Sequence, residues 1–471
     1  MARIVYITNG MASTLNSSLE LNRRLIEAGH EVVYLSHVDL HRAVESHGCR
    51  FIQLQECQKI RDQLSVEIET LKPIRSPANL IKRLRLGRAA RKKSVSSDEI
   101  HSILREIDPD VLLIDFEMHY AILATRQMKI PTLLVAVWFS IFRSHGLPPM
   151  HTNIGPASDF FGHLKINMAW WKLIVKRLCE PLLEIKPRRL KRRFSPVSYG
   201  TNDRADLKAI ARHQNVSLSS LTSRTNWSKP HTYRTIPMLS FNVREMELEH
   251  PVHPLLHYVG PMIQRNRLET KTSEDELRRW SEFQHRCDEE HRKIVYCSLG
   301  TFWSTDTNFL SKVIEAFRNQ TDKSLVIGLG GKSTAEDFSP VPENVLAMQY
   351  APQLEILKSA AVAITHGGIT SINECICFEV PMLVCSTDYV DQPGCAVRLE
   401  HHKLGEKLDL KTSSSSAIIE KVNSLLNDEE IRNNVIKMNS VFQRYADSCT
   451  AEQAIESTIK GQLQSPMRDT R

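Results

Sequence analysis

The sequence lacks any apolar run long enough to cross a membrane. None of its 471 residues lies in a stretch approaching the ~20 consecutive apolar residues that a spanning helix requires. Its start is also too short for a signal-peptide core, because residues 4–7 are followed at once by Asn9 and Gly10. We therefore expect residues 4–7 to form the first strand of a cytoplasmic protein.

A disulfide framework and a zinc-ribbon spacing are absent too. The 10 cysteines are scattered between Cys49 and Cys449, and Cys375 and Cys377 stand one residue closer than the C-x-x-C spacing requires. This pattern favours free thiols, mostly buried, in a reducing compartment. We expect no metal site.

Signatures of several enzyme classes are missing. The run from Gly328 to Ser333 resembles a phosphate loop, but the pattern requires glycine at position 326, where Val326 stands. No G-x-G-x-x-G follows the first strand, and neither H-E-x-x-H nor G-x-S-x-G occurs. Nucleoside triphosphatases, hydride-transfer enzymes, zinc peptidases and serine hydrolases are therefore disfavoured.

Positive charge is present in excess, at +7 overall, and it is clustered. The first cluster holds Arg75, Lys82, Arg83, Arg85, Arg88, Arg91, Lys92 and Lys93. The second holds Lys165, Lys172, Lys176, Arg177, Lys186, Arg188, Arg189, Lys191, Arg192 and Arg193, interleaved with Trp170, Trp171, Leu173, Ile174 and Leu178. For the first cluster a solvated helix face stays open, whereas the second favours a helix on an anionic membrane surface. No nucleic-acid-binding motif accompanies the charge, so we expect no nucleic-acid partner.

Alternating apolar runs and helical patterns predict two series of β-α units. The expected strands cover residues 4–7, 32–35, 111–114 and 132–137 in the first series, and 294–297, 325–328, 345–348, 362–365 and 382–385 in the second. Helices are expected at 15–28 and across 415–462. Such a rhythm is typical of parallel, doubly wound sheets.

The fold class is therefore α/β, with two Rossmann-like doubly wound domains facing across a cleft. We expect an N-terminal domain at 1–260 with a helical insertion at 141–235, a linker at 261–292, a C-terminal domain at 293–445, and a last helix and tail at 446–471. Ligands of paired α/β domains usually bind in the cleft between them.

The most informative segment is a strand that ends in His366, Gly367 and Gly368. Thr370 and Ser371 follow at the expected start of a helix, and Ser371 and Glu374 have capping-box spacing. Two glycines allow a ligand close to the backbone, and the free N–H groups of a first helical turn favour an anion. The segment predicts a diphosphate site.

Other predicted strands of the second series also end in polar or aromatic residues that could bind parts of a ligand. They hold Ser298 and Thr301, then Tyr350 and Gln353, then Asp391 and Gln392 after Asp388 and Tyr389. Together with the diphosphate site they offer an aromatic face for a base, a carboxylate for ribose hydroxyls, and an acid–amide pair for sugar hydroxyls.

In these residues the sequence resembles the UDP-glycosyltransferase family of inverting enzymes, whose fold is called GT-B. The resemblance is strong from residue 298 to about 405, and weaker at 1–35 and 108–140. It implies contacts of Tyr350 and Gln353 with the nucleoside, of Glu374 with ribose, of Ser298, Thr301, His366, Thr370 and Ser371 with the diphosphate, and of Asp391 and Gln392 with the sugar.

The resemblance also implies an activity. We expect transfer of a hexose, most often glucose, from a UDP-sugar to a hydroxyl acceptor, without cofactor or metal, because the helix N-terminus and His366 would stabilise the departing diphosphate. The acceptor would bind near residues 9–14, 115–120 and 138–145. The second basic cluster suggests a small amphipathic or lipid-like acceptor.

The chain departs from the family at the catalytic base. Alignment of the first helix places Thr14 where most members carry histidine, while Asp115 matches its aspartate partner. Asp115 itself or His119 could act as the base, or the acceptor could be acidic enough to need little help. His119 could also be an ordinary structural histidine. A non-catalytic nucleotide-sugar-binding partner protein remains the alternative.

Overall fold

The computed structural model describes residues 1–71, 76–183, 194–227, 231–267, 269, 271–300, 306–387, 390–409 and 411–462. The predicted site residue Thr301 lies outside this set, as do Asp388 and Tyr389. Outside it too are Arg75 of the first basic cluster, the tail beyond residue 462, and Lys186, Arg188, Arg189, Lys191, Arg192 and Arg193 of the second basic cluster.

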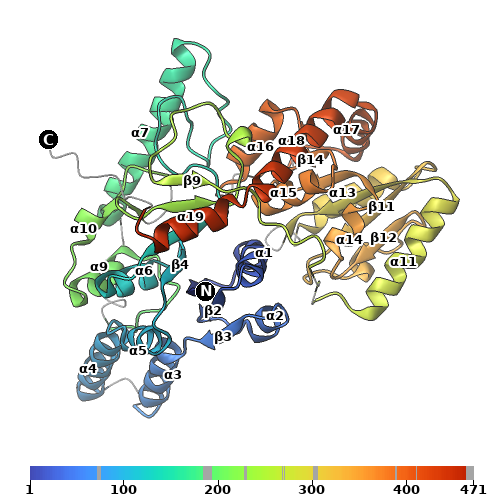
Figure 1. Ribbon diagram of the computed structural model, residues 1–471. Coiled ribbons are helices and arrows are strands. Elements are labelled where there is room, and N and C mark those ends of the chain that lie inside the picture. Colours follow the sequence, from blue (N-terminus) through green and yellow to red (C-terminus); the bar gives the residue numbers. More distant parts are fainter. Residues whose placement is uncertain are drawn as a thin grey trace.

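The first domain is built on a seven-stranded sheet in the order β3-β2-β1-β4-β5-β8-β9, in which every neighbouring pair is parallel (Figure 1). The strands are β1 (Arg3–Ile7), β2 (Glu31–Ser36), β3 (Arg50–Gln53), β4 (Val111–Asp115), β5 (Thr132–Ala136), β8 (Met238–Ser240) and β9 (Leu256–Tyr258). A separate antiparallel pair joins β6 (Thr222–Ser223) and β7 (Thr232–Tyr233). All five residues of β4 are buried, because helices cover both faces of a parallel sheet.

The helices of this domain include the expected first helix and a helical insertion. They are α1 (Ala12–Glu27), α2 (His41–Glu45), α3 (Glu56–Glu69), α4 (Pro77–Ser94), α5 (Asp98–Ile107), α6 (His119–Thr125), η1 (Arg126–Met128), α7 (Phe160–Leu183), α9 (Arg204–His213), α10 (Leu218–Leu221) and η2 (Arg244–Met246).

The second domain is built on a six-stranded parallel sheet in the order β12-β11-β10-β13-β14-β15. Its strands are β10 (Lys293–Ser298), β11 (Lys323–Gly328), β12 (Val345–Met348), β13 (Ala360–Thr365), β14 (Met382–Val384) and β15 (Gly405–Lys407). Its helices are α11 (Glu274–Glu289), α13 (Thr307–Phe317), η3 (Ala335–Phe338), α14 (Gln353–Leu357), α15 (Ile369–Cys377), α16 (Gln392–His401), α17 (Ser415–Asn427) and α18 (Glu429–Asp447), followed by α19 (Thr450–Ile459). Two doubly wound sheets confirm the predicted fold class.

The structure adds elements that the sequence pattern missed. The strands β8, β9 and β15 have three residues each, which is too short to show a period. The expected linker contains α11, whose Trp280, Phe283 and Cys287 are buried. That helix belongs to the second domain, because its apolar face packs beside β12.

The last helix returns to the first domain. Figure 1 shows α19 lying across the strands of the first sheet, where Ala451 and Ile455 are fully buried. The chain thus crosses between the domains twice, and the two crossings touch: a Cβ on Gly260, whose φ is +84°, would lie 2.5 Å from Cβ of Tyr445. Only glycine permits this approach.

A buried ion pair joins the two domains. Nε of Arg398 on α16 donates to Glu247 at 2.6 Å, and both side chains are shielded from solvent. Glu247 also accepts from the Ser140 backbone N–H at 2.9 Å and from the Tyr258 hydroxyl at 3.2 Å. The domain contact therefore includes a network in which a buried charge has several partners.

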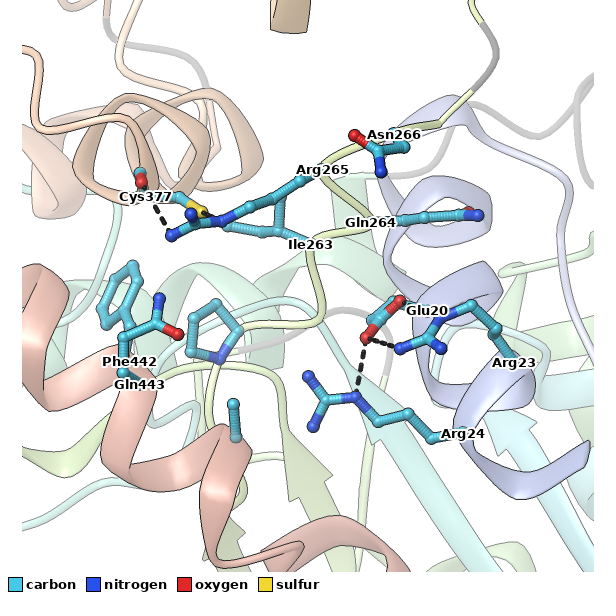
Figure 2. A pocket seen from close by; sticks show the side chains of 12 residues that line it. Glu20, Arg23, Arg24, Ile263, Gln264, Arg265, Asn266, Cys377, Phe442 and Gln443 are labelled. Atoms are coloured by element: carbon cyan, nitrogen blue, oxygen red, sulfur yellow. Dashed lines mark hydrogen bonds and ion pairs between the residues drawn. The ribbon is translucent and has the colours of Figure 1, made fainter. Parts of the chain in front are cut away.

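A cavity of about 410 Å³ lies between α1, α15 and α18, and Figure 2 shows the side chains that line it. Glu20 holds Arg23 and Arg24 on its α1 side, and Arg265 reaches Cys377 on the α15 side. Its lining is Glu20, Arg23, Arg24, Pro261, Ile263, Gln264, Arg265, Asn266, Cys377, Phe442, Gln443 and Ala446, and none of these is a predicted site residue.

All ten cysteines are free thiols and most are buried, as predicted. Within the described ranges, no helix combines the length and apolar character that a bilayer crossing demands.

Candidate functional site

The diphosphate segment forms the junction of β13 and α15. Gly368 is the N-cap of α15, and no side chain caps that helix. The predicted capping box of Ser371 and Glu374 is therefore wrong: the observed N-cap lies three residues before the predicted one, so Ser371 lies inside the helix, and Glu374 has other partners. The glycines allow the turn to close directly after the strand.

His366 is fixed at the mouth of this junction by two glycines. A Cβ on Gly300 would lie 2.6 Å from its Cε1, and a Cβ on Gly368 would lie 2.5 Å from its Nε2. Burial lowers the pKa of His366 to about 4, against a smaller opposing effect of the Ser298 backbone. The imidazole is thus neutral at pH 7 and can donate one hydrogen bond to an anion.

Thr370 supplies a second polar group at the same helix end. Its hydroxyl oxygen is buried and has no hydrogen-bond partner within the described ranges. The first N–H groups of α15 also lack intrahelical acceptors, as in any helix. A neutral imidazole, an unpaired hydroxyl and free N–H groups together suit a bound oxyanion.

Glu374 and Gln353, predicted to bind the ribose and the nucleoside, are brought together. Glu374 is 2% exposed, accepts from Nη1 of Arg267 at 3.0 Å, and accepts from the Gln353 amide. Gln353 in turn accepts from the Tyr296 hydroxyl at 3.2 Å. Burial raises the pKa of Glu374 although Arg267 opposes this.

Sequence reasoning missed Arg267, because it lies in a charged stretch that we took for a linker. Arg267 also pairs with Glu269 at 2.9 Å. Nothing in the local pattern distinguishes it from the neighbouring solvated charges.

Tyr350 lies beside this pair at the start of the α14 turn. Its backbone N–H donates to Glu276 at 2.8 Å, and the Lys271 ammonium lies 5.9 Å from its ring centroid. The ring is half-buried, so one part of it stays accessible to a flat ligand.

Asp391 and Gln392 begin α16, against the first domain. The Gln392 side chain accepts from the Thr387 hydroxyl at 2.5 Å, and the backbone N–H of Gly394 donates to the Met150 carbonyl at 2.7 Å. Burial raises the pKa of Asp391 to about 6. The pair predicted to read sugar hydroxyls thus stands at the domain boundary.

On the opposite side, Asp115 ends β4. It is 2% exposed, its Oδ1 accepts from the Glu117 backbone N–H at 3.1 Å, and its Oδ2 has no partner within the described ranges. Burial raises its pKa, and the backbone N–H groups of Glu117 and Asn9 oppose this.

Glu117 is a site residue that sequence reasoning missed. Its Oε2 accepts from Nδ2 of Asn9 at 3.3 Å, in the loop after β1. Burial, Asp115 and Asp391, in that order, raise its pKa well above the ordinary value. The available signal was its position two residues beyond Asp115, in the turn that directly follows β4.

The other two candidate bases are buried as well. Thr14 lies in the first turn of α1 and is 2% exposed. His119 begins α6, is 1% exposed, and its Nδ1 lies 3.0 Å from the Tyr233 hydroxyl. Of the two roles left open for His119, this environment favours the structural one.

Aromatic rings adjoin the carboxylates. Trp138 is half-buried, 5.1 Å from the ring of Phe116 and 4.8 Å from that of Trp227. Its position, within the region expected to hold the acceptor, provides an apolar wall. Within the described ranges, no group of three His, Cys, Asp or Glu side chains has an arrangement that could hold a metal ion.

Comparison with known proteins shows which sequences and folds this chain resembles. Residues 223–446 match the family described as UDP-glucoronosyl and UDP-glucosyl transferase. The uncharacterized UDP-glucosyltransferase YdhE of Bacillus subtilis (strain 168) is 32% identical over 168 residues, 36% of this chain and 42% of that protein. The zeaxanthin glucosyltransferase of Pantoea ananas is 23% identical over 228 residues, 47% of this chain and 50% of that protein.

Solved structures extend the similarity to the whole chain. The glycotransferase of kitacinnamycin has a TM-score of 0.67 at 18% identity, covering 97% of this chain and 98% of that chain. The calicheamicin glycosyltransferase CalG4 has a TM-score of 0.59 at 15% identity, covering 98% of this chain and 99% of that chain.

The structural matches and the sequence matches support different conclusions. The solved structures confirm the predicted GT-B fold, and at such identities they concern the fold alone. The sequence matches confirm the predicted resemblance to the UDP-glycosyltransferase family, although the chain spans half or less of the two curated relatives.

Proposed function

We propose that this chain, with its GT-B fold and its resemblance to the UDP-glycosyltransferases, is an inverting hexosyltransferase that uses a UDP-sugar. The observation that carries the proposal is the oxyanion site at the start of α15. There His366 is clamped between glycines and the buried Thr370 hydroxyl has no partner in the described chain. A departing diphosphate would satisfy these groups without a metal ion.

The two domains then divide the reaction. The nucleotide would lie along Tyr350, Gln353 and Glu374, with its diphosphate at α15 and its sugar toward Asp391 and Gln392. The acceptor hydroxyl would attack the anomeric carbon from the side of the first domain. One displacement with the leaving group on the opposite face inverts the anomeric configuration.

Glucose is the sugar we propose, on the basis of the relatives. YdhE and the Pantoea protein are both named glucosyltransferases, and the name of the second gives zeaxanthin as its acceptor. For this chain we propose the same sugar. For its acceptor we propose only the same apolar character.

A lipid-like acceptor is supported by the outer face of α7. Its large apolar side chains are between 45% and 75% exposed: Phe160, Phe161, Leu164, Met168, Trp171, Val175 and Leu178. Lys165, Lys172 and Lys176 stand exposed among them. An apolar stripe interleaved with ammonium groups matches the surface of an anionic membrane, from which such an acceptor could be taken.

The inner face of the same helix corrects part of the sequence interpretation. Trp170 is 1% exposed and donates to the Leu147 carbonyl at 2.7 Å, so only Trp171 of the pair is free to meet a membrane. Arg177 is 3% exposed and donates to backbone carbonyls that include Arg224 at 3.2 Å. Both belong to the core.

The direct test supplies the purified chain with a panel of UDP- and dTDP-sugars and follows product, nucleotide release and thermal stability. We expect transfer or slow hydrolysis with UDP-glucose. Stabilisation by RT ln(1 + [L]/Kd) without UDP release would support the non-catalytic partner protein instead. Neither turnover nor stabilisation with any sugar nucleotide would overturn both.

A further inference from the structure

Because Thr14 stands where most family members carry the catalytic histidine, the proposed reaction needs another group to accept the proton. The structure disfavours three of the candidates. A threonine hydroxyl such as that of Thr14 cannot take a proton near pH 7. His119 is buried against Tyr233. Asp115 is 2% exposed, and one of its oxygens is occupied by the Glu117 N–H.

Glu117 differs from these three in access. It is half-buried rather than enclosed, and its carboxylate accepts a long hydrogen bond of 3.3 Å from the neutral amide of Asn9. It follows β4 at the carboxyl edge of the first sheet, the edge at which ligands of such sheets bind. Asp391 of the second domain lies within electrostatic range of it, which places Glu117 at the cleft.

The neighbouring Asp115 carries an independent sign of an unfilled polar site. Its Oδ1 is held by the Glu117 backbone N–H, and the Asn9 backbone N–H also acts on the carboxylate, but the buried Oδ2 makes no hydrogen bond of good geometry in the described chain. A buried carboxylate oxygen that lacks a donor leaves room for a hydroxyl or a shared proton.

We propose that Glu117 is the catalytic base of this chain, taking the place of the absent histidine, with Asp115 as the positioning residue behind it. The inference rests on the proposed sugar transfer. The acceptor O–H gives its proton to the Glu117 carboxylate while its oxygen forms the bond to the anomeric carbon. The bond from that carbon to the diphosphate breaks, and the diphosphate departs with the electron pair.

The electrostatic setting suits this role. A general base works best when its pKa lies near the working pH. Burial first, and then the carboxylates of Asp115 and Asp391, raise the pKa of Glu117 from the range of an ordinary glutamate toward neutrality. No cation is among the groups acting on it there.

The test compares two acceptors that differ in their need for a base. With UDP-glucose as donor, water must lose a proton during attack, whereas 4-nitrophenol is largely ionised already at pH 8. For Glu117→Gln we expect hydrolysis to fall by ~10²–10⁴-fold and transfer to 4-nitrophenol to fall far less. The acidic limb of the kcat/KM profile for hydrolysis should disappear.

The matched control is Glu106→Gln, which removes an exposed carboxylate on α5 and should leave both rates unchanged. Thermal stabilisation by UDP-glucose should be the same in wild type and Glu117→Gln. Unchanged hydrolysis with its acidic limb intact in Glu117→Gln would overturn the proposal. Equal losses with both acceptors would do so too, because a structural defect does not depend on the acidity of the acceptor.

Failure of the proposed function has a different signature. In that case the wild type itself shows neither turnover nor stabilisation with UDP-glucose, before any variant is compared.

Discussion

The two domains share an architecture but hold their chemical groups differently. In the second domain, the described predicted residues follow the ends of β10, β12 and β13 or begin α14, α15 and α16, within short stretches of sequence. In the first domain, Asn9 and Glu117 come together from positions 108 residues apart. A diphosphate can be met by local backbone geometry, whereas an acceptor site has to be assembled from distant segments.

The domains also set charge in opposite ways. Burial lowers the pKa of His366 to about 4 and so favours a neutral imidazole on the donor side. Burial raises the pKa values of Asp115 and Glu117, so the carboxylates on the acceptor side hold a proton more readily than ordinary ones. One domain thus favours loss of a proton from its histidine, and the other favours gain of a proton by its carboxylates.

The largest expected effect comes from breaking the ion pair that joins the domains. Arg398→Ala leaves Glu247 buried without its cation, which typically costs about 3–5 kcal/mol of unfolding free energy. Urea denaturation measures this. Lys358→Ala, which removes an exposed ion pair, is the control and should change little. A loss in Arg398→Ala no larger than the control would show that the domains do not depend on this pair.

The next largest effect tests the donor side alone. His366→Ala removes a donor to the departing diphosphate and should lower kcat with UDP-glucose by about 10²–10³-fold. His285→Ala, at an exposed position on α11, should leave kcat unchanged. If His366→Ala turns over as fast as the wild type, groups other than His366 stabilise the departing diphosphate.

A smaller effect, on stability, tests the acceptor side without any substrate. An acid whose pKa is raised by folding contributes stability below its ordinary pKa and loses it as the pH rises through the raised value. Glu117→Gln mimics the protonated form, so the variant should gain stability relative to wild type at pH 8 but not at pH 4. One pKa unit corresponds to about 1.4 kcal/mol. Thermal melts at both pH values measure the gain, and a difference that is independent of pH would contradict the raised pKa.

The smallest effect concerns the outer face of α7. Trp171→Glu should weaken co-sedimentation with phosphatidylserine vesicles several-fold at low salt, because it adds a negative charge to the apolar stripe. Leu277→Glu makes the same change in charge at an exposed apolar residue of α11 and should have no effect. Binding that is equal in all three proteins, or absent in the wild type, would remove the membrane from the proposed function.

The contrast between the domains also explains which strands and site residues the sequence predicted and which it did not. Runs of buried residues such as β4 and β13 revealed two doubly wound sheets, because a continuous apolar run reflects burial on both faces. The three-residue strands β8, β9 and β15 show no period and were missed, whereas the equally short β14 was found within the apolar run 382–385. Arg267 and Glu117 were missed for a related reason: their partners Glu374 and Asn9 lie 107 and 108 residues away.

The capping box shows the opposite error. Ser371 and Glu374 satisfy a local spacing, yet Arg267 and Gln353 hold the Glu374 carboxylate, so it does not reach back to the helix start. A long-range ion pair outweighed a local pattern.

The meeting of Gly260 and Tyr445 has a mechanical consequence. Because the two connections touch, the covalent link between the domains is confined to one place, and side-chain contacts such as the Arg398–Glu247 pair hold the rest of the boundary. A side chain at position 260 would push the two connections apart. A fragment cut there would lose α19, which shields Val111 and the neighbouring strand of the first lobe. One cut at this point in the chain therefore does not divide the molecule into its two domains.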